Sequence, residues 1–456
     1  MLVALVVAVA VATRSWLPVG LGALAAALVA RPRFAGLVLA LGAAGVVRAD
    51  AASAGLVPRE LGPYTGWVAV VADPQPAGGA TRLVVAVEGQ RYEVWVRGPA
   101  RSARAAGLRS GDLVAMAGER LALAPGRAVR LRSQHVVGEI EPAWLGDVRS
   151  GGALARSANR VRIVIATGAG HLAPDTGALV RGLVIGDDRD QPREMIERFR
   201  ASGLSHLTAV SGQNVALTVA AAGPLLRRAG ALARWVLTIG LIAWFVVVTR
   251  AEPSVLRAGT MAALGATAFA LGRPRQPARL LAIAVAGLLV VDPLLVWSIG
   301  FWLSVGATGG VVALGPWLAD RLTGLGPLAL PVGITLGAQA GVALPSLLVF
   351  GRLSLVGTVA NLLAVPVAGF VMLVGLPACL VAGTVPAVGP LVMAPIGVAA
   401  RWIDAVATVG AALEPSGPAL VAGWLALAVT VVALVTVGGR SRRAFESPTL
   451  RESTAP

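Results

Sequence analysis

Long apolar stretches separated by short loops are the feature that most constrains how this chain can fold. Nine of them fill residues 203–439, and three more lie within residues 2–47. A bilayer core about 30 Å thick needs about 20 mostly apolar residues for each crossing helix. Because 56% of the 456 residues are hydrophobic and only 14% are charged, we interpret the chain as a polytopic α-helical membrane protein with about 12 transmembrane helices.

The limits of the apolar runs give the expected membrane helices. A secretory signal peptide has a basic start and one cleavable apolar run, and the N-terminal region matches neither feature, so we expect its runs to be retained as helices. They are 2–13, 16–30 and 34–47, followed later by 203–222, 230–249, 255–272, 279–292, 296–316, 327–350, 354–380, 387–411 and 418–438.

Residues 50–140 have a different pattern, with short β-type runs between Gly, Pro and Asp turns. The stretch "VEGQRYEVWV" is typical of a β-hairpin, and "RSARAAGLR" (101–109) predicts a helix between strands. Several short strands with one inserted helix favour a small OB-like barrel. The Arg-rich stretch that follows, "ALARSANRVRIVIATG", has helical spacing and suits a helix along the membrane surface.

Arginine supplies all 39 basic residues, and the net charge is +16. This charge suits phosphate recognition and membrane topology equally. The short Arg-bearing loops at 227–234, 273–279 and 440–443 belong on the cytoplasmic side by the positive-inside rule. The expected organisation is N-terminal helices (1–49), an extracytoplasmic OB-like domain (50–140), an amphipathic connecting region (141–200), a transmembrane domain (201–439) and a cytoplasmic polar tail (440–456).

The residue inventory excludes several chemistries. Without lysine the chain cannot hold a Walker A motif, so it does not hydrolyse ATP through a P-loop. The single cysteine, Cys379, allows neither an intrachain disulfide nor a cysteine metal cluster. The three histidines are far apart in sequence. We therefore expect no metal and no cofactor.

The segment "SHLTAVSGQNV" (205–215) is unusually polar for the edge of an apolar run. A strongly polar side chain at membrane depth costs about 2.5–3.5 kcal/mol, so it usually faces a cavity or a partner. At helical spacing His206 and Gln213 share one face, while Ser211 and Asn214 share another. The pair Ser211-Gly212 is also suited to interrupt the helix where backbone lines a cavity.

Three further polar segments interrupt the apolar runs. They are "TRAEPSVLRAGTMA", "GFWLSVGATGG" and "FGRLSLVGTVANLLAVPVAG". Small residues in these segments also suit close helix packing, and a buried arginine suits a structural pair, so both interpretations stay open. The candidate residues for lining one path through the membrane are His206, Ser211, Gln213, Asn214, Arg257, Ser304 and Asn361.

The presence of both Ser211 and His206 also suggests an alternative, an intramembrane serine hydrolase. Five residues correspond to about 140° around a helix, so the two side chains do not easily face one substrate atom. A G-x-S-x-G elbow is also absent from the sequence. We therefore expect that the chain is not an enzyme.

The polar segments resemble the motifs of ComEC-type competence proteins. "GLSHLTAVSGQNVAL" is similar to the family's G-x-x-H-L-L-A-I-S-G-L-H signature, although Asn214 stands where the family often has a second His. In order along the chain, "ALVRGLVIGDDRD", "PSVLRAGTMA", "VVDPLLVWSIGFWLSVGATGG" and "LSLVGTVANLLAVPVAG" resemble further family elements. A second departure is Trp302, where the family often has Gln.

The resemblance implies a multi-pass channel for single-stranded DNA in the bacterial cytoplasmic membrane during natural transformation. It also implies an external DNA receptor and a cytoplasmic DNA-translocating ATPase as partners. Many relatives carry a C-terminal metallo-β-lactamase-like domain, whereas this sequence ends in a short polar tail. We therefore expect any nuclease to be a separate chain. A transporter or flippase for another polyanion or a lipid remains the alternative.

An OB-like domain binds single strands by stacking bases on aromatic side chains beside basic ones. By strand alternation Arg91, Trp95 and Arg97 share one face, while Tyr92 shares the more apolar face with Val94 and Val96. Trp95 is therefore the better stacking candidate, and the aromatic side chains are equally suited to the barrel core. The candidate DNA-binding residues are Trp67, Arg82, Arg91, Tyr92, Trp95 and Arg97.

Overall fold

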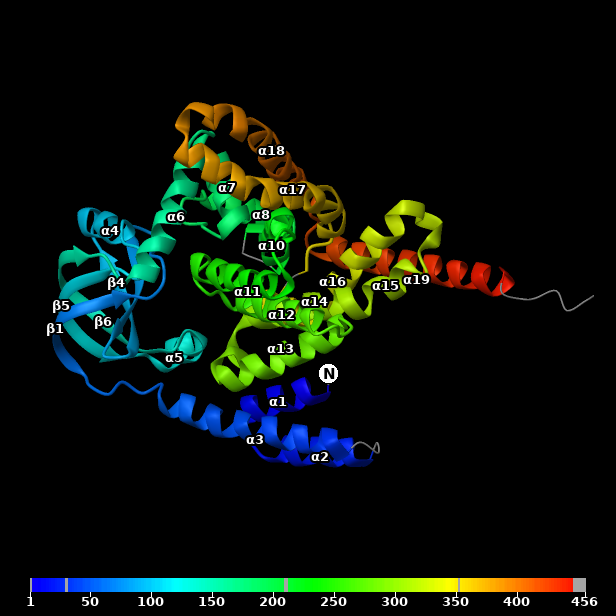
Figure 1. Ribbon diagram of the computed structural model, residues 1–456, viewed down its shortest axis with the longest axis horizontal. Coiled ribbons are helices and arrows are strands. Elements are labelled where there is room, and N and C mark those ends of the chain that lie inside the picture. Colours follow the sequence, from blue (N-terminus) through cyan, green and yellow to red (C-terminus); the bar gives the residue numbers. More distant parts are fainter. Residues whose placement is uncertain (1, 29–31, 209–211, 352, 446–456) are drawn as a thin grey trace, which may run out of the picture. The chain divides into compact units, whose positions relative to one another are not determined.

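A computed structural model describes residues 2–28, 32–208, 212–351 and 353–445. The chain forms two compact units (Figure 1). Unit 1 comprises residues 1–192, 206–302 and 368–401, and unit 2 comprises residues 193–205, 303–367 and 402–456. Both units contain residues of three long helices, which are α14 (Ile299–Ala313), α17 (Gly357–Thr384) and α18 (Gly389–Leu413).

Unit 1 begins with three apolar helices that pack on one another, α1 (Leu2–Thr13), α2 (Leu17–Leu28) and α3 (Pro32–Ala54). Glycine allows this close approach. A Cβ atom at Gly42 of α3 would lie 2.8 Å from both methyl groups of Val19 on α2. Arg48 of α3 donates to the carbonyls of Val290 and Val291, at 3.1 and 2.6 Å. These carbonyls end helix α13 (Pro277–Val291), so the N-terminal helices are attached to the later part of unit 1.

A β-barrel follows the N-terminal helices. Its elements are β1 (Gly62–Val70), β2 (Gln75–Ala77), β3 (Ala80–Val87), β4 (Gln90–Arg97), α4 (Pro99–Ala106), β5 (Leu113–Ala122), α5 (Pro125–Leu131), the 3-10 helix η1 (Arg132–Gln134) and β6 (Val136–Arg149). The strand order β1-β5-β6-β4-β3 closes on itself because β3 also pairs with β1. Strands β4 and β6 run parallel, and the other pairs are antiparallel.

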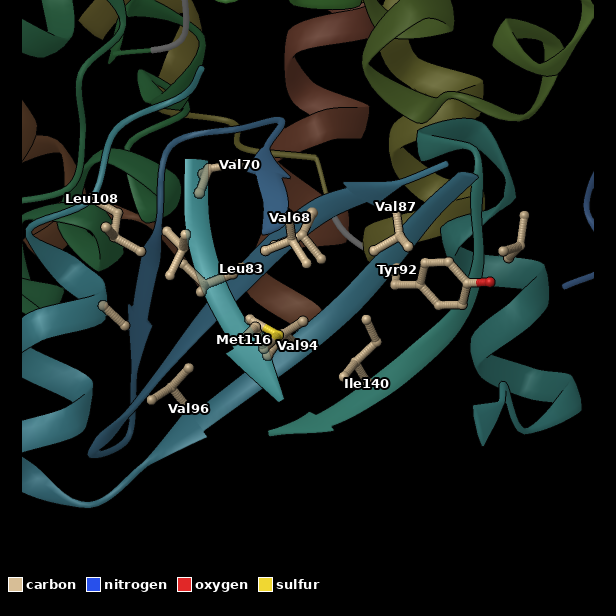
Figure 2. Close-up of a cluster of buried hydrophobic side chains, with 14 residues drawn as sticks. Val68, Val70, Leu83, Val87, Tyr92, Val94, Val96, Leu108, Met116 and Ile140 are labelled. Carbon is tan, nitrogen blue, oxygen red and sulfur yellow. The ribbon is translucent and has the colours of Figure 1, made fainter. Parts of the chain in front are cut away.

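The barrel core follows from strand alternation. Val94 and Val96 of β4 point inward and are at most 1% exposed, and Tyr92 is 2% exposed. They pack in one cluster with Leu83 of β3, Met116 of β5 and Ile140 of β6 (Figure 2). The prediction that Tyr92 lies on the core side is therefore confirmed. The strands extend over residues 62–149 rather than 50–140, because α3 continues to Ala54 and β6 continues to Arg149.

Unit 1 also contains helices that follow the barrel in the chain. They are α6 (Ala153–Ala169), α7 (Pro174–Ile185), α9 (Ser205–Thr208), α10 (Gly212–Leu226), α11 (Ala231–Val248), α12 (Pro253–Ala270), α13, and the 3-10 helices η2 (Pro293–Trp297) and η4 (Pro386–Val388). Helix α6 packs on α17, since a Cβ atom at Gly168 would collide with the backbone of Cys379. This face of α6 therefore contributes to a packed helical layer.

Unit 2 contains α8 (Arg193–Ala201), α15 (Gly315–Ala319), the 3-10 helix η3 (Thr323–Leu328), α16 (Ala329–Phe350), α19 (Pro418–Phe445) and parts of the three shared helices. The carboxylate of Glu414 accepts hydrogen bonds from the backbone amides of Leu355 and Val356, at 2.9 and 3.0 Å. These contacts fix the chain entering α17. Arg198 of α8 pairs with Asp404 of α18 at 3.0 Å.

Glycine-to-glycine contact joins α14 and α15 to α16. Gly306 faces Gly341, Gly310 faces Gly337, and a Cβ atom on any of these four would collide with opposing backbone. Farther along, a Cβ atom at Gly333 would lie 2.7 Å from the carbonyl oxygen of Gly315. Small residues at helix interfaces allow the backbones to approach in membrane proteins.

Six helices in the described residues are long and apolar enough to cross a membrane, which supports the membrane class expected from the sequence. They are Ala35–Ala54, Ala231–Val248, Thr323–Phe350, Gly357–Thr384, Pro386–Leu413 and Pro418–Thr436. Shorter apolar helices are Val3–Thr13, Pro277–Val291 and Ile299–Ala313. Helices α10 and α12 belong to neither group, so the expected number of about 12 spans stays a prediction.

The glycine contacts predict a position-specific effect on stability. Gly310→Ala should destabilise the protein by about 1–3 kcal/mol or more, because the added methyl group has no space beside Gly337. Gly300→Ala in the same helix is the matched control, since nothing lies within 4 Å of its Cβ position. Thermal unfolding of the two purified variants measures the difference. Equal melting temperatures would contradict the packing described.

Candidate functional site

The described residues 212–215 of the polar segment lie where several helices of unit 1 meet. Asn214, near the start of α10, is 2% exposed. Its Nδ2 donates to the carbonyl oxygens of Leu183 and Val184, at 2.6 and 3.4 Å. These carbonyls belong to the last turn of α7, which ends at the left-handed Gly186. Because the last carbonyls of a helix lack partners within it, Asn214 stabilises the end of α7.

Two further candidates, Arg257 and Gln213, lie at the start of α10. Arg257 of α12 is 4% exposed, and its Nη1 donates to the sulfur of Met261 at 3.1 Å. Its Nη2 would lie 3.1 Å from a Cβ atom at Gly212. Gln213 is exposed, and its Nε2 would lie 3.3 Å from a Cβ atom at Gly369 of α17. The start of α10 is thus enclosed by α7, α12 and α17.

The other path candidates are distributed. His206 is exposed on α9, and Ser211 falls outside the described residues. Ser304 and Asn361 belong to unit 2. Asn361 donates from Nδ2 to the carbonyl of Gly357 at 2.7 Å, and its buried Oδ1 has no partner among the described residues. The structure therefore gathers Gln213, Asn214 and Arg257, and one path through all seven residues stays a prediction.

A buried ion network, which the sequence interpretation missed, lies beside this region. Arg162 of α6 is 5% exposed and contacts Asp73 at 2.9 Å and Asp187 at 3.4 Å. Arg250, directly after α11, binds both oxygens of Asp73, at 2.9 and 3.0 Å. The side-chain oxygen of Asn159 accepts from Arg250 at 2.7 Å. The network joins the barrel loop before β2 to α6 and to the end of α11.

The second half of the network lies in the "GDDRD" segment after α7. Arg189 binds both oxygens of Asp187, at 2.8 and 3.0 Å. Burial alone would raise the pKa of Asp187, but Arg189 and Arg162 outweigh burial and lower it to about 2. Burial opposes Arg162 and Arg250 in the same way at Asp73, where the pKa also lies below its ordinary value. Both carboxylates therefore stay ionised at neutral pH.

Glu252 has the opposite electrostatic environment. It lies between α11 and α12, close enough to Asp188 for the two charges to interact. Burial, and next the charge of Asp188, raise the pKa of Glu252 to about 7. Burial raises the pKa of Asp188 as well. Two adjacent carboxyl groups thus resist ionisation next to a network whose carboxylates are fully ionised.

The barrel candidates divide among separate environments. Trp95 and Arg97 line a cavity of about 630 Å³ together with Arg127 and Arg130. Arg82 binds Glu93 at 2.5 Å, so its charge is already balanced. Glu93 is only 3% exposed although it lies on the outer face, because Arg82 and Arg127 cover it.

The remaining three barrel candidates lie elsewhere. Tyr92 is in the core, Trp67 is covered by the guanidinium of Arg149 at 4.1 Å, and Arg91 lines a second cavity. The six candidates therefore do not form one surface. Trp95 is half-buried and lies next to the exposed Arg97, whereas the exposed Trp67 lies beside Arg149.

Comparison with known proteins shows which family the helical part of the chain is similar to. A family model described as "Competence protein" matches residues 183–443. The protein YcaI of Escherichia coli (strain K12) is 29% identical over an alignment of 231 residues. The match covers 47% of this chain and 30% of YcaI. ComE operon protein 3 of Bacillus subtilis (strain 168) is 28% identical over 207 residues, which are 45% of this chain and 26% of that protein. No solved structure matches the chain.

The ion network predicts an unequal effect of two neighbouring substitutions. Asp187→Asn removes the carboxylate that binds Arg189 and leaves the buried Arg162 with Asp73 as its acidic partner, so it should destabilise the protein by about 3–5 kcal/mol. Asp190→Asn is the control, because Asp190 is 65% exposed and pairs with Arg181, and it should change stability by less than about 1 kcal/mol. Chemical unfolding of the purified full chain measures both.

The pH dependence of the stability difference between wild type and Asp187→Asn follows from the lowered pKa of Asp187. Because the folded-state value of about 2 lies below the ordinary 3.8, the stabilisation is complete above about pH 4. It should be lost as the pH falls toward about 2. A difference between wild type and Asp187→Asn that does not shrink over this range would contradict the assignment.

Glu252 predicts the reverse pH dependence. Its folded-state pKa of about 7 exceeds the ordinary 4.5, so the folded chain retains a proton that the unfolded chain releases. Stability from this group therefore falls as the pH rises from about 4.5 to about 7. Glu252→Gln should be more stable than wild type by about 1–3 kcal/mol near pH 8 and equal to it near pH 4. Unfolding curves at the two pH values provide the measurement.

Proposed function

The chain belongs to the competence protein family, and from this membership we propose that it conducts single-stranded DNA across the cytoplasmic membrane of a bacterium during DNA uptake. The observation that carries the proposal is the family match over residues 183–443. Every candidate membrane span except Ala35–Ala54 lies inside this match. The matched segments cover less than a third of each curated relative, so substrate and partners are part of the proposal.

We propose different roles for the polar residues at the start of α10. Asn214 and Arg257 are buried and hold α10 against α7 and α12, and thus position the segment. His206 and Gln213 are exposed and contact the passing strand. Both side chains can hydrogen-bond to phosphate or to base edges. The alternation of an anchored and an exposed face explains the polarity of the whole segment.

The barrel is the proposed extracytoplasmic binding element for the strand. Five strands closed into a barrel, with α4 between β4 and β5, support an OB-type fold. Trp95 offers a surface for base stacking, and Arg97 offers charge for the backbone. Glu139 and Glu141 in the same cavity limit how many phosphates it accepts. Stacking of one or a few bases therefore suits this cavity better than tracking a long backbone.

We propose that this chain transports DNA, and that ATP hydrolysis and nuclease activity belong to other proteins. The described residues contain no group of three or more His, Cys, Asp or Glu side chains that could hold a metal ion. An external receptor, a DNA-translocating ATPase in the cytoplasm and a separate nuclease are the proposed partners. Each remains to be identified by its own experiment.

Deletion of the gene in its native host tests the proposal directly. End-labelled duplex DNA is added, and label is followed into the nuclease-protected cytoplasmic fraction. Loss of protected label with retained surface-bound label supports import through this chain. Unchanged import would refute it and favour transport of another polyanion or a lipid.

Substitutions then test the exposed face. Complementation with His206→Ala or Gln213→Ala should lower DNA uptake about two- to tenfold, the effect expected from losing one hydrogen bond. Thr335→Ala is the control, because the Thr335 hydroxyl is exposed and donates to its own helix at 2.9 Å. Membrane levels of each variant are measured by immunoblot. Normal uptake with both alanine variants would remove these residues from the path.

A further inference from the structure

A second barrel cavity, of about 570 Å³, lies at the C-terminal end of α3. Its walls come from residues 52–59, from the turn between β3 and β4, and from the start of β6. Its charged or polar lining consists of Arg59, Gln90, Arg91 and His135, and the other lining residues are Ala, Gly, Leu and Val. None of the described lining residues carries a carboxylate. This lining therefore suits an anion with an apolar portion.

Hydrogen bonds fix the backbone at Arg59 and the guanidinium of Arg91 at this cavity. The backbone amide of Arg59 donates to Oε1 of Gln90 at 2.9 Å, and Nε2 of Gln90 donates to the carbonyl of Val57 at 2.9 Å. Nη1 of Arg91 donates to the carbonyl of Gln134 at 3.1 Å. These contacts leave both guanidinium charges without an ion pair in the part of the chain that the structure describes.

The acid whose charge acts on Arg91, Asp292, is already engaged. Nε2 of His135 donates to Oδ2 of Asp292 at 2.9 Å, while Oδ1 of Asp292 accepts from the amide of Leu294 at 3.1 Å. The guanidinium of Arg132 lies 3.2 Å from the ring centre of Trp297. The wall that bears His135 is therefore fastened to η2, and the cavity has a fixed shape.

Burial lowers the pKa of Arg91, and the charge of Asp292 offsets this only in part. A guanidinium that has lost water and lacks a direct carboxylate gains stability from a bound anion. Arginine is also the side chain best matched to phosphate, because its planar N–H groups form paired hydrogen bonds with two oxygens. A phosphate group is thus the anion that fits best.

The position of the cavity indicates the source of the phosphate. The candidate span Ala35–Ala54 ends in the cavity wall. A helix that crosses a bilayer ends at the level of the lipid head groups. Beyond this end, Val57 and Leu61 are 65% and 58% exposed on both sides of Arg59. Exposed apolar side chains next to an arginine are typical of segments that lie in the membrane interface.

We propose that this cavity binds the phosphate head group of an anionic phospholipid, with Arg59 and Arg91 on the phosphate and the acyl chains along α3. The bound lipid fixes the barrel relative to the membrane surface. This site is separate from the cavity beside Trp95, and the proposal does not depend on DNA transport.

Lipid binding by the purified full chain in detergent tests the proposal. Phosphatidylglycerol and phosphatidylcholine are titrated, and bound lipid is measured by native mass spectrometry. We expect saturable binding of phosphatidylglycerol, at least about tenfold tighter than phosphatidylcholine. Arg59→Gln/Arg91→Gln should weaken phosphatidylglycerol binding about tenfold or more, the loss expected for two charge-assisted hydrogen bonds. Arg97→Gln/Arg130→Gln, on the other cavity, should leave it unchanged.

Single variants and competing ligands complete the test. Arg59→Gln alone changes an exposed side chain, so it folds even where the double variant does not, and it should weaken binding about threefold. Equal binding of the two lipids, or unchanged binding by Arg59→Gln, would overturn the proposal. A saturable thermal shift with inorganic phosphate alone, equal to that with phosphatidylglycerol, would assign the site to free phosphate instead. Displacement of the lipid by a single-stranded oligonucleotide would assign it to nucleic acid.

Discussion

The carboxylate of Asp73 is the contact on which unit 1 depends. It lies in a barrel loop, yet it accepts from Arg162 of α6 and from Arg250 after α11. Buried ion pairs need accurate geometry, since removing one partner leaves an uncompensated charge. Arg162 continues the network to Asp187, which follows the helix end that Asn214 holds. The barrel and the start of α10 are therefore positioned by one connected set of polar contacts.

That connection gives the proposed function a physical basis. A strand bound at Trp95 is held by a barrel whose position relative to α6 and α11 is set by ion pairs rather than by a flexible linker. A lipid phosphate at Arg59 and Arg91 would anchor the same barrel at the membrane surface. In unit 2, glycine contacts such as Gly310 against Gly337 serve the corresponding purpose by allowing backbone-to-backbone packing.

Sequence interpretation worked where the deciding physics is local. Strand alternation placed Tyr92 in the barrel core and left Trp95 and Arg97 at the surface, because neighbouring side chains on a strand point to opposite faces. It did not reveal that Arg82 is balanced by Glu93, since that pairing depends on the register between β3 and β4. Helical spacing separated His206 and Gln213 from Asn214, but it did not reveal which of the two faces is anchored.

The sequence by itself determined the membrane class, a β-rich segment near the N-terminus and membership of the competence family, because hydrophobicity and motif order are properties of consecutive residues. Only the tertiary structure decided which polar groups hold the fold. Arg162 meets Asp73 across 89 positions, and Asn214 meets the carbonyl of Leu183 across 31. Buried polar groups must find partners wherever the packing of helices brings them, and no local pattern encodes that choice.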